Sequence, residues 1–193
     1  MSDRLGRQIR FLEEADRLKA VRRQSVLLDG SRRENSAEHS WHVALAALVL
    51  QEHADDPVDI DRVLTLLLLH DLVEIDAGDT FLYDDAANRD KREREERAAE
   101  RVFGLLPSEQ SEILRDAWRE FEDQRTPEAR FAAAVDRLLP VLHNTHHDGA
   151  LWKERGVGRA RVIERNRPMA RAAQRLWRWA ESRIHAAFAE RSG

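Results

Sequence analysis

The sequence contains no cysteine, so it offers neither a disulfide framework nor a thiolate ligand for a metal. Glycine (8 residues) and proline (5) are scarce among the 193 residues. No window alternates β-branched and polar residues between turn residues, the pattern that is typical of strands. Helices must therefore do most of the core-forming, and we expect an all-α protein of six to eight helices.

The sequence also lacks a strong excess of charge and a long apolar run. It has 32 basic and 36 acidic residues, a formal net charge of −4. No basic field is available to attract a nucleic acid polymer or an anionic membrane. The leucine-rich run at 63–69 is too short to span a bilayer. Because the first 18 residues are charged throughout, with no apolar signal segment, we expect a cytoplasmic protein.

The length is that of a single domain with a sizeable core. We expect one domain over 1–193, with a metal-binding core at about 17–147 and a C-terminal helical extension at about 159–190. Apolar spacing and capping residues predict where the helices lie. The expected helices cover about 4–21, 35–52, 57–69, 88–103, 107–123, 126–147 and 168–188, with a loop at 149–158.

A few polar residues stand in apolar helical surroundings. His39 shares a helical face with Val43, Ala46 and Leu50, which directs its imidazole into the core. The pair His70 and Asp71 ends the leucine-rich run, and Glu74 follows on the same side, about one turn later. Asp79 follows the glycine that breaks this helix. These polar groups converge at the end of one buried helix.

Asp136 lies among small and apolar residues in a later helix, so its carboxylate needs a cationic partner. Taken singly, His39 fits a hydrogen-bonded core histidine, and Asp136 fits an ion pair with an arginine. The set is more informative. Two imidazoles and two carboxylates on three buried helices suit one divalent ion such as Mn, Fe, Co, Ni, Zn or Mg. A bound ion of this kind favours hydrolysis by lowering the pKa of its water.

Three segments carry a resemblance to a known family: ENSAEHSWHVALAAL, LLLLHDLVEIDAGDT and FAAAVDRLLPVL. They resemble the HD-domain metal-dependent phosphohydrolases, most closely the YfbR-like 5'-deoxynucleotidase branch, over roughly 17–143. The resemblance implies that His39, His70, Asp71 and Asp136 hold the metal. It also implies catalytic roles for Glu74 and Asp79, and a homodimer.

The segment RLKAVRRQ places the phosphate-binding arginine of this branch at Arg23, with Arg22 as a close alternative. An arginine suits that role because its planar guanidinium can donate two hydrogen bonds to phosphate oxygens. Gln24 stands where the well-known bacterial enzyme has a tryptophan near the deoxyribose. We therefore expect Gln24 to bind the sugar end of the substrate and to discriminate against ribose less strongly.

The predicted function is metal-dependent hydrolysis of a (deoxy)nucleoside 5'-monophosphate to nucleoside and phosphate. One alternative is an HD phosphohydrolase that acts on another phosphorylated small molecule or a cyclic nucleotide. Another is a non-catalytic metal-binding sensor, against which the presence of both Glu74 and Asp79 argues. His42 and His143 remain open as residues of the pocket or of the surrounding core.

Overall fold

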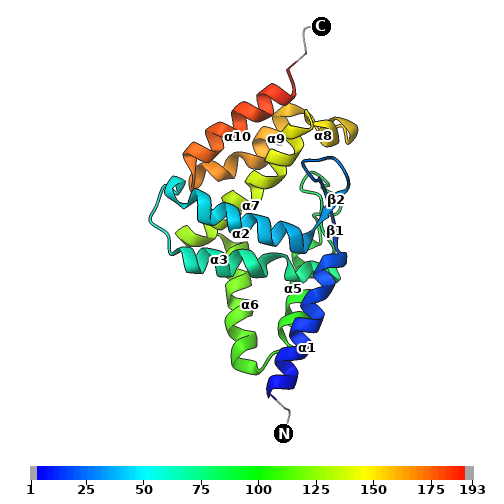
Figure 1. Cartoon of the computed structure of the whole chain (residues 1–193), viewed down its shortest axis with the longest axis vertical. Coiled ribbons are helices and arrows are strands. Elements are labelled where there is room, and N and C mark those ends of the chain that lie inside the picture. Colours follow the sequence, from blue (N-terminus) through cyan, green and yellow to red (C-terminus); the bar gives the residue numbers. More distant parts are fainter. Residues whose placement is uncertain (1–3, 190–193) are drawn as a thin grey trace.

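The computed structural model describes residues 4–189, so the end of the expected C-terminal extension, at about 190, lies outside the described residues. Figure 1 shows an elongated stack of helices, with the first helix at one end and the last helix at the other. Within the described part, no helix is both long enough and apolar enough to cross a membrane.

Three helices form the centre of the molecule: α2 (Ser36–Leu50), α3 (Ile60–Leu69) and α7 (Pro127–His146). α3 packs against both α2 and α7, and these two helices also contact each other. Val43, Leu66, Leu67 and Phe131 are fully buried between them. The leucine-rich run expected to form a core helix is therefore in the core, and the expected all-α fold class is confirmed.

The remaining helices pack on both sides of this centre (Figure 1). α6 packs against α3, α5 packs against α6 and the turn that follows α3, and α10 with its neighbours packs against α7. Their bounds are α1 Arg4–Asp16, α4 Glu74–Ala77, α5 Lys91–Phe103, α6 Ser108–Asp123, α8 Ala150–Glu154, α9 Arg159–Asn166 and α10 Gln174–Ala187. Short 3₁₀ turns cover Arg17–Ala20, Gln51–His53, His70–Val73 and Arg167–Arg171. Among the described residues, seven of the α-helices have ten or more residues, within the expected six to eight.

Side chains fix the starts of two central helices. Asn35 accepts a hydrogen bond from the backbone of Glu38, whose side chain in turn accepts one from the backbone of Asn35, a complete capping box for α2. Thr126 caps α7 in a similar way by accepting a hydrogen bond from the backbone of Ala129, with Pro127 as the first helical residue. Both starts agree with the sequence predictions.

The prediction that the chain forms no strands is wrong at one place. β1 (Arg22–Val26) and β2 (Arg33–Asn35) form a small antiparallel hairpin, with Arg22 opposite Asn35 and Val26 opposite Arg33. Gly30 adopts a φ of 73° in the connecting turn, a left-handed conformation that suits glycine. The strands are short and polar, so the alternating pattern used to search for strands is missing. The Asp29-Gly30 pair is the local signal for this turn.

The C-terminal part also differs from the prediction. The expected loop at 149–158 contains α8, and the single helix expected at 168–188 is replaced by a 3₁₀ turn and a later start of α10 at Gln174. Pro168 is the second residue of that turn. Asp55, from a distant loop, accepts a hydrogen bond from the backbone of Gln174, and its own backbone donates to Ala172. This long-range contact fixes the break, and local spacing gives no sign of it.

Candidate active site

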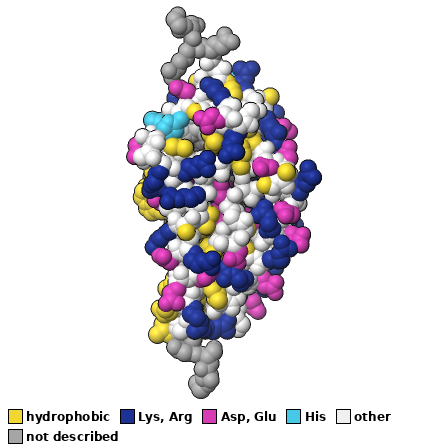
Figure 2. Space-filling view, turned by 90° about the vertical axis from the view of Figure 1, so that its right-hand side faces the viewer, with side chains coloured by type: hydrophobic (Ala, Val, Ile, Leu, Met, Phe, Trp, Pro, Cys, Tyr) yellow, Lys and Arg dark blue, Asp and Glu magenta, His cyan; other side chains and the backbone are white. Residues whose placement is uncertain are grey.

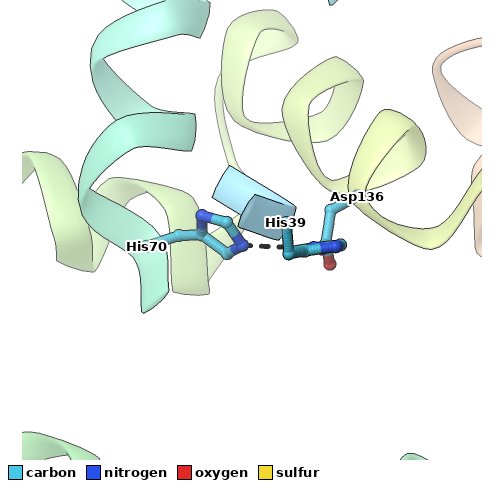
Figure 3. A group of neighbouring side chains, drawn as sticks. All are labelled: His39, His70 and Asp136. Carbon is cyan, nitrogen blue, oxygen red and sulfur yellow. Dashed lines mark hydrogen bonds and ion pairs between the residues drawn. The ribbon is translucent and has the colours of Figure 1, made fainter. Parts of the chain in front are cut away.

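Three side chains from the centre of the molecule meet at one point. His39 comes from α2, His70 from the 3₁₀ turn that directly follows α3, and Asp136 from α7 (Figure 3). Each offers one ligand atom, and these atoms lie within 4.8 Å of one another. The Oδ1 atom of Asp136 lies 2.8 Å from Nε2 of His39 and 3.5 Å from Nε2 of His70. This spacing is that of a compact cluster able to surround one ion.

The orientation of His70 indicates what the cluster is suited to bind. Its Nδ1 donates a hydrogen bond to the backbone oxygen of Leu67 at 2.7 Å, which leaves the lone pair of a neutral ring on Nε2. Nε2 is buried without a hydrogen-bond partner, and it lies 3.0 Å from Oδ1 of Asp71. A lone pair that faces carboxylates is repulsive unless a cation lies between them. The donor set therefore fits a divalent metal ion.

The pKa shifts of His70 and Asp136 also indicate that the cluster is stabilised by positive charge. Burial disfavours a charged imidazole, but the carboxylates of Asp71 and Asp136 nevertheless raise the pKa of His70 to about 9. Burial also works against a charged Asp136, yet the hydrogen-bonded imidazole of His39 and the imidazole of His70, 3.5 Å away, hold the pKa of Asp136 well below its usual range. The metal-free cluster keeps protons where an ion would supply the positive charge.

Arg23 lies beside the cluster, on β1, with only 12% of its side chain exposed. One of its terminal nitrogens is 2.8 Å from Oδ2 of Asp71, 3.8 Å from Glu74 and 3.7 Å from Asp79. Burial opposes its charge, but these carboxylates outweigh burial and raise the pKa of Arg23 above its ordinary value. Arg23 therefore stays charged in the site. Arg22, the alternative, is exposed and points its guanidinium to the backbone of Arg33.

Glu74 and Asp79 are acids in a crowded, buried setting. Burial, followed by repulsion from Asp71, raises the pKa of Glu74 to about 8, although Arg23 opposes the shift. Burial likewise raises the pKa of Asp79. The hydroxyl of Ser36 donates a hydrogen bond of 2.6 Å to Glu74, which fixes the direction of its carboxylate. Glu74 is therefore able to hold or release a proton near neutral pH, and the pKa of Asp79 is shifted in the same direction.

These groups open onto one cavity of about 230 Å³. The side chains that line it near the cluster are Arg23, Gln24, His70, Asp71, Glu74, Asp79 and Asp136. Its walls also carry the aromatic rings of Phe81, Tyr83 and Trp152, and the ring of Phe121 lies against His70, with 4.8 Å between the ring centres. A polar end beside an apolar wall is typical of a small-molecule site.

The structure thus brings together every residue selected from the sequence. Gln24 lines the cavity, and its side-chain oxygen accepts a hydrogen bond of 3.0 Å from Arg155. His39 lies behind the cavity wall with none of its side chain exposed. His143 is buried in the core beside His42, with 5.7 Å between the ring centres, and neither histidine lines the cavity.

Sequence reasoning missed several charged residues of the site. Lys91 and Glu95 line the cavity from α5, 3.3 Å apart, although a stretch as highly charged as residues 91–97 is typical of a solvated helix face. Burial raises the pKa of Glu95 to about 7 despite the nearby Lys91. Glu34, directly before the α2 capping residue, is 1% exposed and lies 3.5 Å from Nδ1 of His39. The only local signal for Glu34 is its place in the ENSAEH segment.

An all-α fold with a buried His, His and Asp cluster beside paired acids and an arginine defines a candidate metal-dependent hydrolase. A family model described as HD domain matches residues 15–177, so the chain belongs to the HD domain family. The family resemblance inferred from the sequence, and the expectation of an enzyme, are thereby confirmed.

Named relatives and solved structures agree with this family. Human 5'-deoxynucleotidase HDDC2 is 30% identical over 141 residues, which cover 72% of this chain and 68% of the human protein. The Bos taurus protein of the same name is 31% identical over 150 residues, 77% of this chain and 72% of its own length.

A predicted metal-dependent phosphohydrolase from Magnetospirillum magnetotacticum MS-1 has a solved structure that matches with a TM-score of 0.89, 48% identity and 95% coverage of both chains. A conserved hypothetical protein from Pyrococcus furiosus matches with a TM-score of 0.64 over 92% of this chain and 98% of its own. At 20% identity, this second structure supports the fold alone.

Proposed function

We propose that this HD-domain protein is a metal-dependent phosphomonoesterase that hydrolyses nucleoside 5'-monophosphates, preferentially the 2'-deoxy compounds, to nucleoside and phosphate. The observation that carries the proposal is one cavity that joins the His70 and Asp136 end, suited to a metal, with the buried cation Arg23. The similar 5'-deoxynucleotidases support the choice of substrate class.

In this proposal His39, His70, Asp71 and Asp136 hold one divalent ion. Asp71 is included because its Oδ1 lies 3.0 Å from Nε2 of His70, on the side that faces the cluster. When bound, the ion supplies Lewis acidity that activates water and polarises a phosphate ester. Imidazole and carboxylate ligands suit Mn, Fe, Co, Ni, Zn and Mg to different degrees, so activity and affinity are to be compared among these ions.

Arg23 binds the phosphate dianion. Its guanidinium is held at the edge of the cavity by Asp71, Glu74 and Asp79, and it stays charged throughout the working pH range. A planar guanidinium can donate two parallel hydrogen bonds to phosphate oxygens. The three carboxylates around Arg23 repel an anion unless a metal ion offsets their charge. Phosphate binding therefore depends on the metal.

Glu74 and Asp79 handle the protons. Glu74, fixed by Ser36, orients the attacking water and accepts its proton. Asp79 lies 3.7 Å from the same guanidinium nitrogen and donates a proton to the leaving O5'. Burial raises the pKa of both carboxyl groups, for Glu74 to about 8, which favours proton transfer by these acids.

The nucleoside lies along the rest of the cavity. Gln24 borders the polar end and, with Arg155, presents hydrogen-bonding groups to the sugar. The partly buried rings of Phe81 and Tyr83 also line the cavity and offer aromatic surface to a base. A polar Gln24 accommodates a 2'-hydroxyl better than a bulky aromatic ring does, so the preference for deoxyribose is expected to be moderate.

The proposal also concerns the form in which the protein works. α2 exposes an apolar row, Trp41, Leu45, Leu48 and Val49, that suits contact with a second copy in a homodimer. Basic and acidic side chains are interspersed over the face in Figure 2, so this face offers no uniformly basic surface to a nucleic acid polymer or a membrane. The cytoplasmic location expected from the sequence belongs to the same proposal.

The experiment that tests the function is a phosphate-release screen of the purified protein. Ribo- and deoxyribonucleoside 5'-monophosphates are each assayed with Mn²⁺, Co²⁺, Mg²⁺, Ni²⁺ and Zn²⁺, and 3'-monophosphates and cyclic nucleotides serve as comparison substrates. We expect release from 5'-monophosphates with at least one ion and none in excess chelator. Release from cyclic nucleotides alone, or from no substrate with any ion, contradicts the proposal.

A further inference from the structure

Glu34 is the most deeply buried carboxylate among the described residues outside the set selected for the site. It lies in the middle of β2, between the hairpin turn and the capping residue of α2, and it is 1% exposed. Nitrogen atoms from three different elements face it. Nε of Arg23 and Nδ1 of His39 lie 3.4 Å and 3.5 Å from its Oε1, and Nδ1 of His143 lies 3.8 Å from its Oε2.

These contacts leave buried polar atoms short of hydrogen bonds. Oε1 of Glu34, Nε of Arg23 and Nδ1 of both His39 and His143 are buried without a hydrogen-bond partner. A buried carboxylate is costly unless donors surround it, and the donors are present a few tenths of an ångström beyond hydrogen-bond distance. Small side-chain movements therefore turn the ion pairs into hydrogen bonds. The pKa of Glu34 is accordingly low: burial raises it, but His39 and Arg23 lower it further.

The position of Glu34 links two parts of the site from behind. Its partner Arg23 faces the phosphate end, where the same side chain contacts Asp71. Its partner His39 turns the other ring nitrogen, Nε2, toward Asp136 at 2.8 Å. If Nδ1 of His39 carries the proton, its N–H donates a hydrogen bond to Glu34. The lone pair of the neutral ring then lies on Nε2, the atom that faces the proposed ion.

We propose that Glu34 is a positioning residue that fixes the tautomer and direction of His39 for metal binding, and that also holds the base of the Arg23 side chain. The inference rests on the proposed metal site but goes beyond it, because Glu34 contacts neither the ion nor the substrate. One carboxylate thereby couples the arrangement of the metal ligand to that of the phosphate-binding residue.

The replacement Glu34→Gln tests this role at nearly constant volume. An amide offers one acceptor oxygen to three facing donors, and its NH₂ group repels at least one of them. We expect the dissociation constant of Mn²⁺ or Co²⁺ to rise by about 10 to 100-fold, the usual effect of removing a carboxylate that orients a metal-bound histidine. Isothermal titration calorimetry on metal-free protein measures the constant directly, without an activity assay.

Glu38→Gln is the matched control. The variant changes a carboxylate to an amide four residues later in the chain. Glu38 is partly exposed, pairs with Arg32, and occupies a capping-box position that glutamine also serves. We expect its metal affinity to equal that of the wild type within about twofold, within the few tenths of a kcal/mol typical of such exposed contacts. A similar loss in both variants overturns the specific role of Glu34.

A second measurement separates positioning from simple destabilisation. The visible absorption spectrum of bound Co²⁺ reports ligand geometry, and we expect it to change in Glu34→Gln while the far-UV circular dichroism spectrum stays native. Should that variant fail to fold, Glu34→Asp, which keeps the charge on a shorter side chain, replaces it in both measurements. Its metal affinity is expected between those of Glu34→Gln and the wild type.

The outcomes distinguish this inference from the proposed function. If the wild type binds no divalent ion, the proposed metal site is wrong and the positioning role falls with it. If the wild type binds metal and the folded Glu34 variants bind it equally well with the same Co²⁺ spectrum, the positioning role alone is wrong. A selective loss in the Glu34 variants supports it.

Discussion

Three carboxylates surround the guanidinium of Arg23, and a fourth, Glu34, lies behind it. A single cation cannot neutralise that many charges in a buried site, so the metal-free protein holds extra protons on Glu74 and His70 instead. The metal ligands, the phosphate-binding arginine and the proton-transfer acids therefore interact electrostatically, although they have different proposed roles. A substitution at one of them changes both the binding of metal and the protonation of its neighbours.

Glu74→Gln is expected to abolish most catalysis while metal remains bound. The change keeps the size of the side chain and its hydrogen bond to Ser36, but it removes the group proposed to accept a proton. Loss of a general acid or base usually costs about 10²- to 10⁴-fold in kcat. Steady-state kinetics and elemental analysis on the same preparation check both parts. Near-normal turnover contradicts the role, and loss of metal identifies Glu74 as a ligand.

Arg23→Ala is expected to impair nucleotide hydrolysis more than hydrolysis of p-nitrophenyl phosphate. A nucleotide is held at both the phosphate and the nucleoside end, and the arginine converts that remote binding into correct alignment at the reacting phosphorus. The measurement is the ratio of kcat/KM for the two substrates in the variant and the wild type. Arg22→Ala, at an exposed neighbouring position, is the control and is expected to leave the ratio unchanged. An equal loss for both substrates contradicts the assignment.

Each ligand reaches the cluster because a particular helix begins or ends in the right place. α2 starts one residue after the capping residue Asn35, which places His39 on the face toward α7. α3 ends at Leu69, so His70 and Asp71 fall in a 3₁₀ turn whose altered spacing directs both toward the same point. Helix boundaries thus set the geometry of the site.

Asn35→Ala tests this dependence on the boundary of α2. Loss of an N-capping side chain costs about 1 kcal/mol, equivalent to a decrease of about 2 to 4 °C in Tm for a protein of this size. We expect that decrease in differential scanning calorimetry, together with a weaker affinity for metal, because fraying loosens the first turn, which carries His39. Thr126→Ala, at the α7 cap ten residues before Asp136, is expected to lower Tm comparably with a smaller effect on metal binding.

The same elements show how far the sequence alone predicts the structure. The leucine-rich run, Asn35 and the Thr126-Pro127 start are local signals, and the helices they predict are present. The β1 and β2 hairpin carries only a turn signal, because its pairing is supported by contacts with distant helices rather than by strand-forming residues. The break before α10 depends on Asp55, more than a hundred residues away in the chain.

The candidate site divides in the same way. Polar residues are unusual on apolar helical faces, which makes the proposed metal ligands stand out: His39, His70, Asp71 and Asp136. The resemblance to the HD family assigns these four residues to one metal site. Their convergence is a property of the fold. Glu34 does not stand out, since a glutamate beside a polar turn normally faces solvent. Its burial arises because the hairpin folds over the start of α2, and no local pattern encodes that arrangement.

At the scale of the whole molecule, the cluster joins helices that belong to different parts of the chain. His39 and Asp136 are 97 residues apart, and each lies on a central helix. An ion bound between them would cross-link α2, α3 and α7, the helices that form most of the core. Ligands that bind only the folded state stabilise it by mass action, so metal binding increases the free energy of unfolding.

Addition of Mn²⁺ or Co²⁺ to the metal-free protein is therefore expected to raise Tm. At a free concentration about 100 times the dissociation constant, the gain is about 2.7 kcal/mol, which corresponds to about 5 to 11 °C for a chain of this length. Differential scanning fluorimetry with and without chelator measures the difference. Asp136→Asn, which removes a ligand but preserves the shape, is expected to lose most of the gain. An unchanged gain in that variant contradicts the proposed ligand set.

The increase in Tm on metal binding is also expected to depend on pH, and to become larger as the pH rises. Burial and Asp71 raise the pKa of Glu74 from an ordinary 4.5 to about 8 in the metal-free fold, so the folded protein holds a proton that the unfolded chain has lost. The pKa of His70 is raised from 6.5 to about 9, despite burial, by Asp71 and Asp136. In both cases the folded state binds more protons than the unfolded state, and stability is lost as the pH rises.

The Tm of the metal-free protein should consequently fall between about pH 6.5 and 9, the window bounded by the ordinary and raised pKa values of His70. A bound ion replaces those protons as the source of positive charge, so the metal-loaded protein should lose less stability over the same interval. The difference in Tm between the two forms then widens as the pH increases. Melting curves at half-unit pH steps, with and without chelator, measure it. A difference that stays constant or narrows toward pH 9 would show that the ion does not bind among these titrating groups.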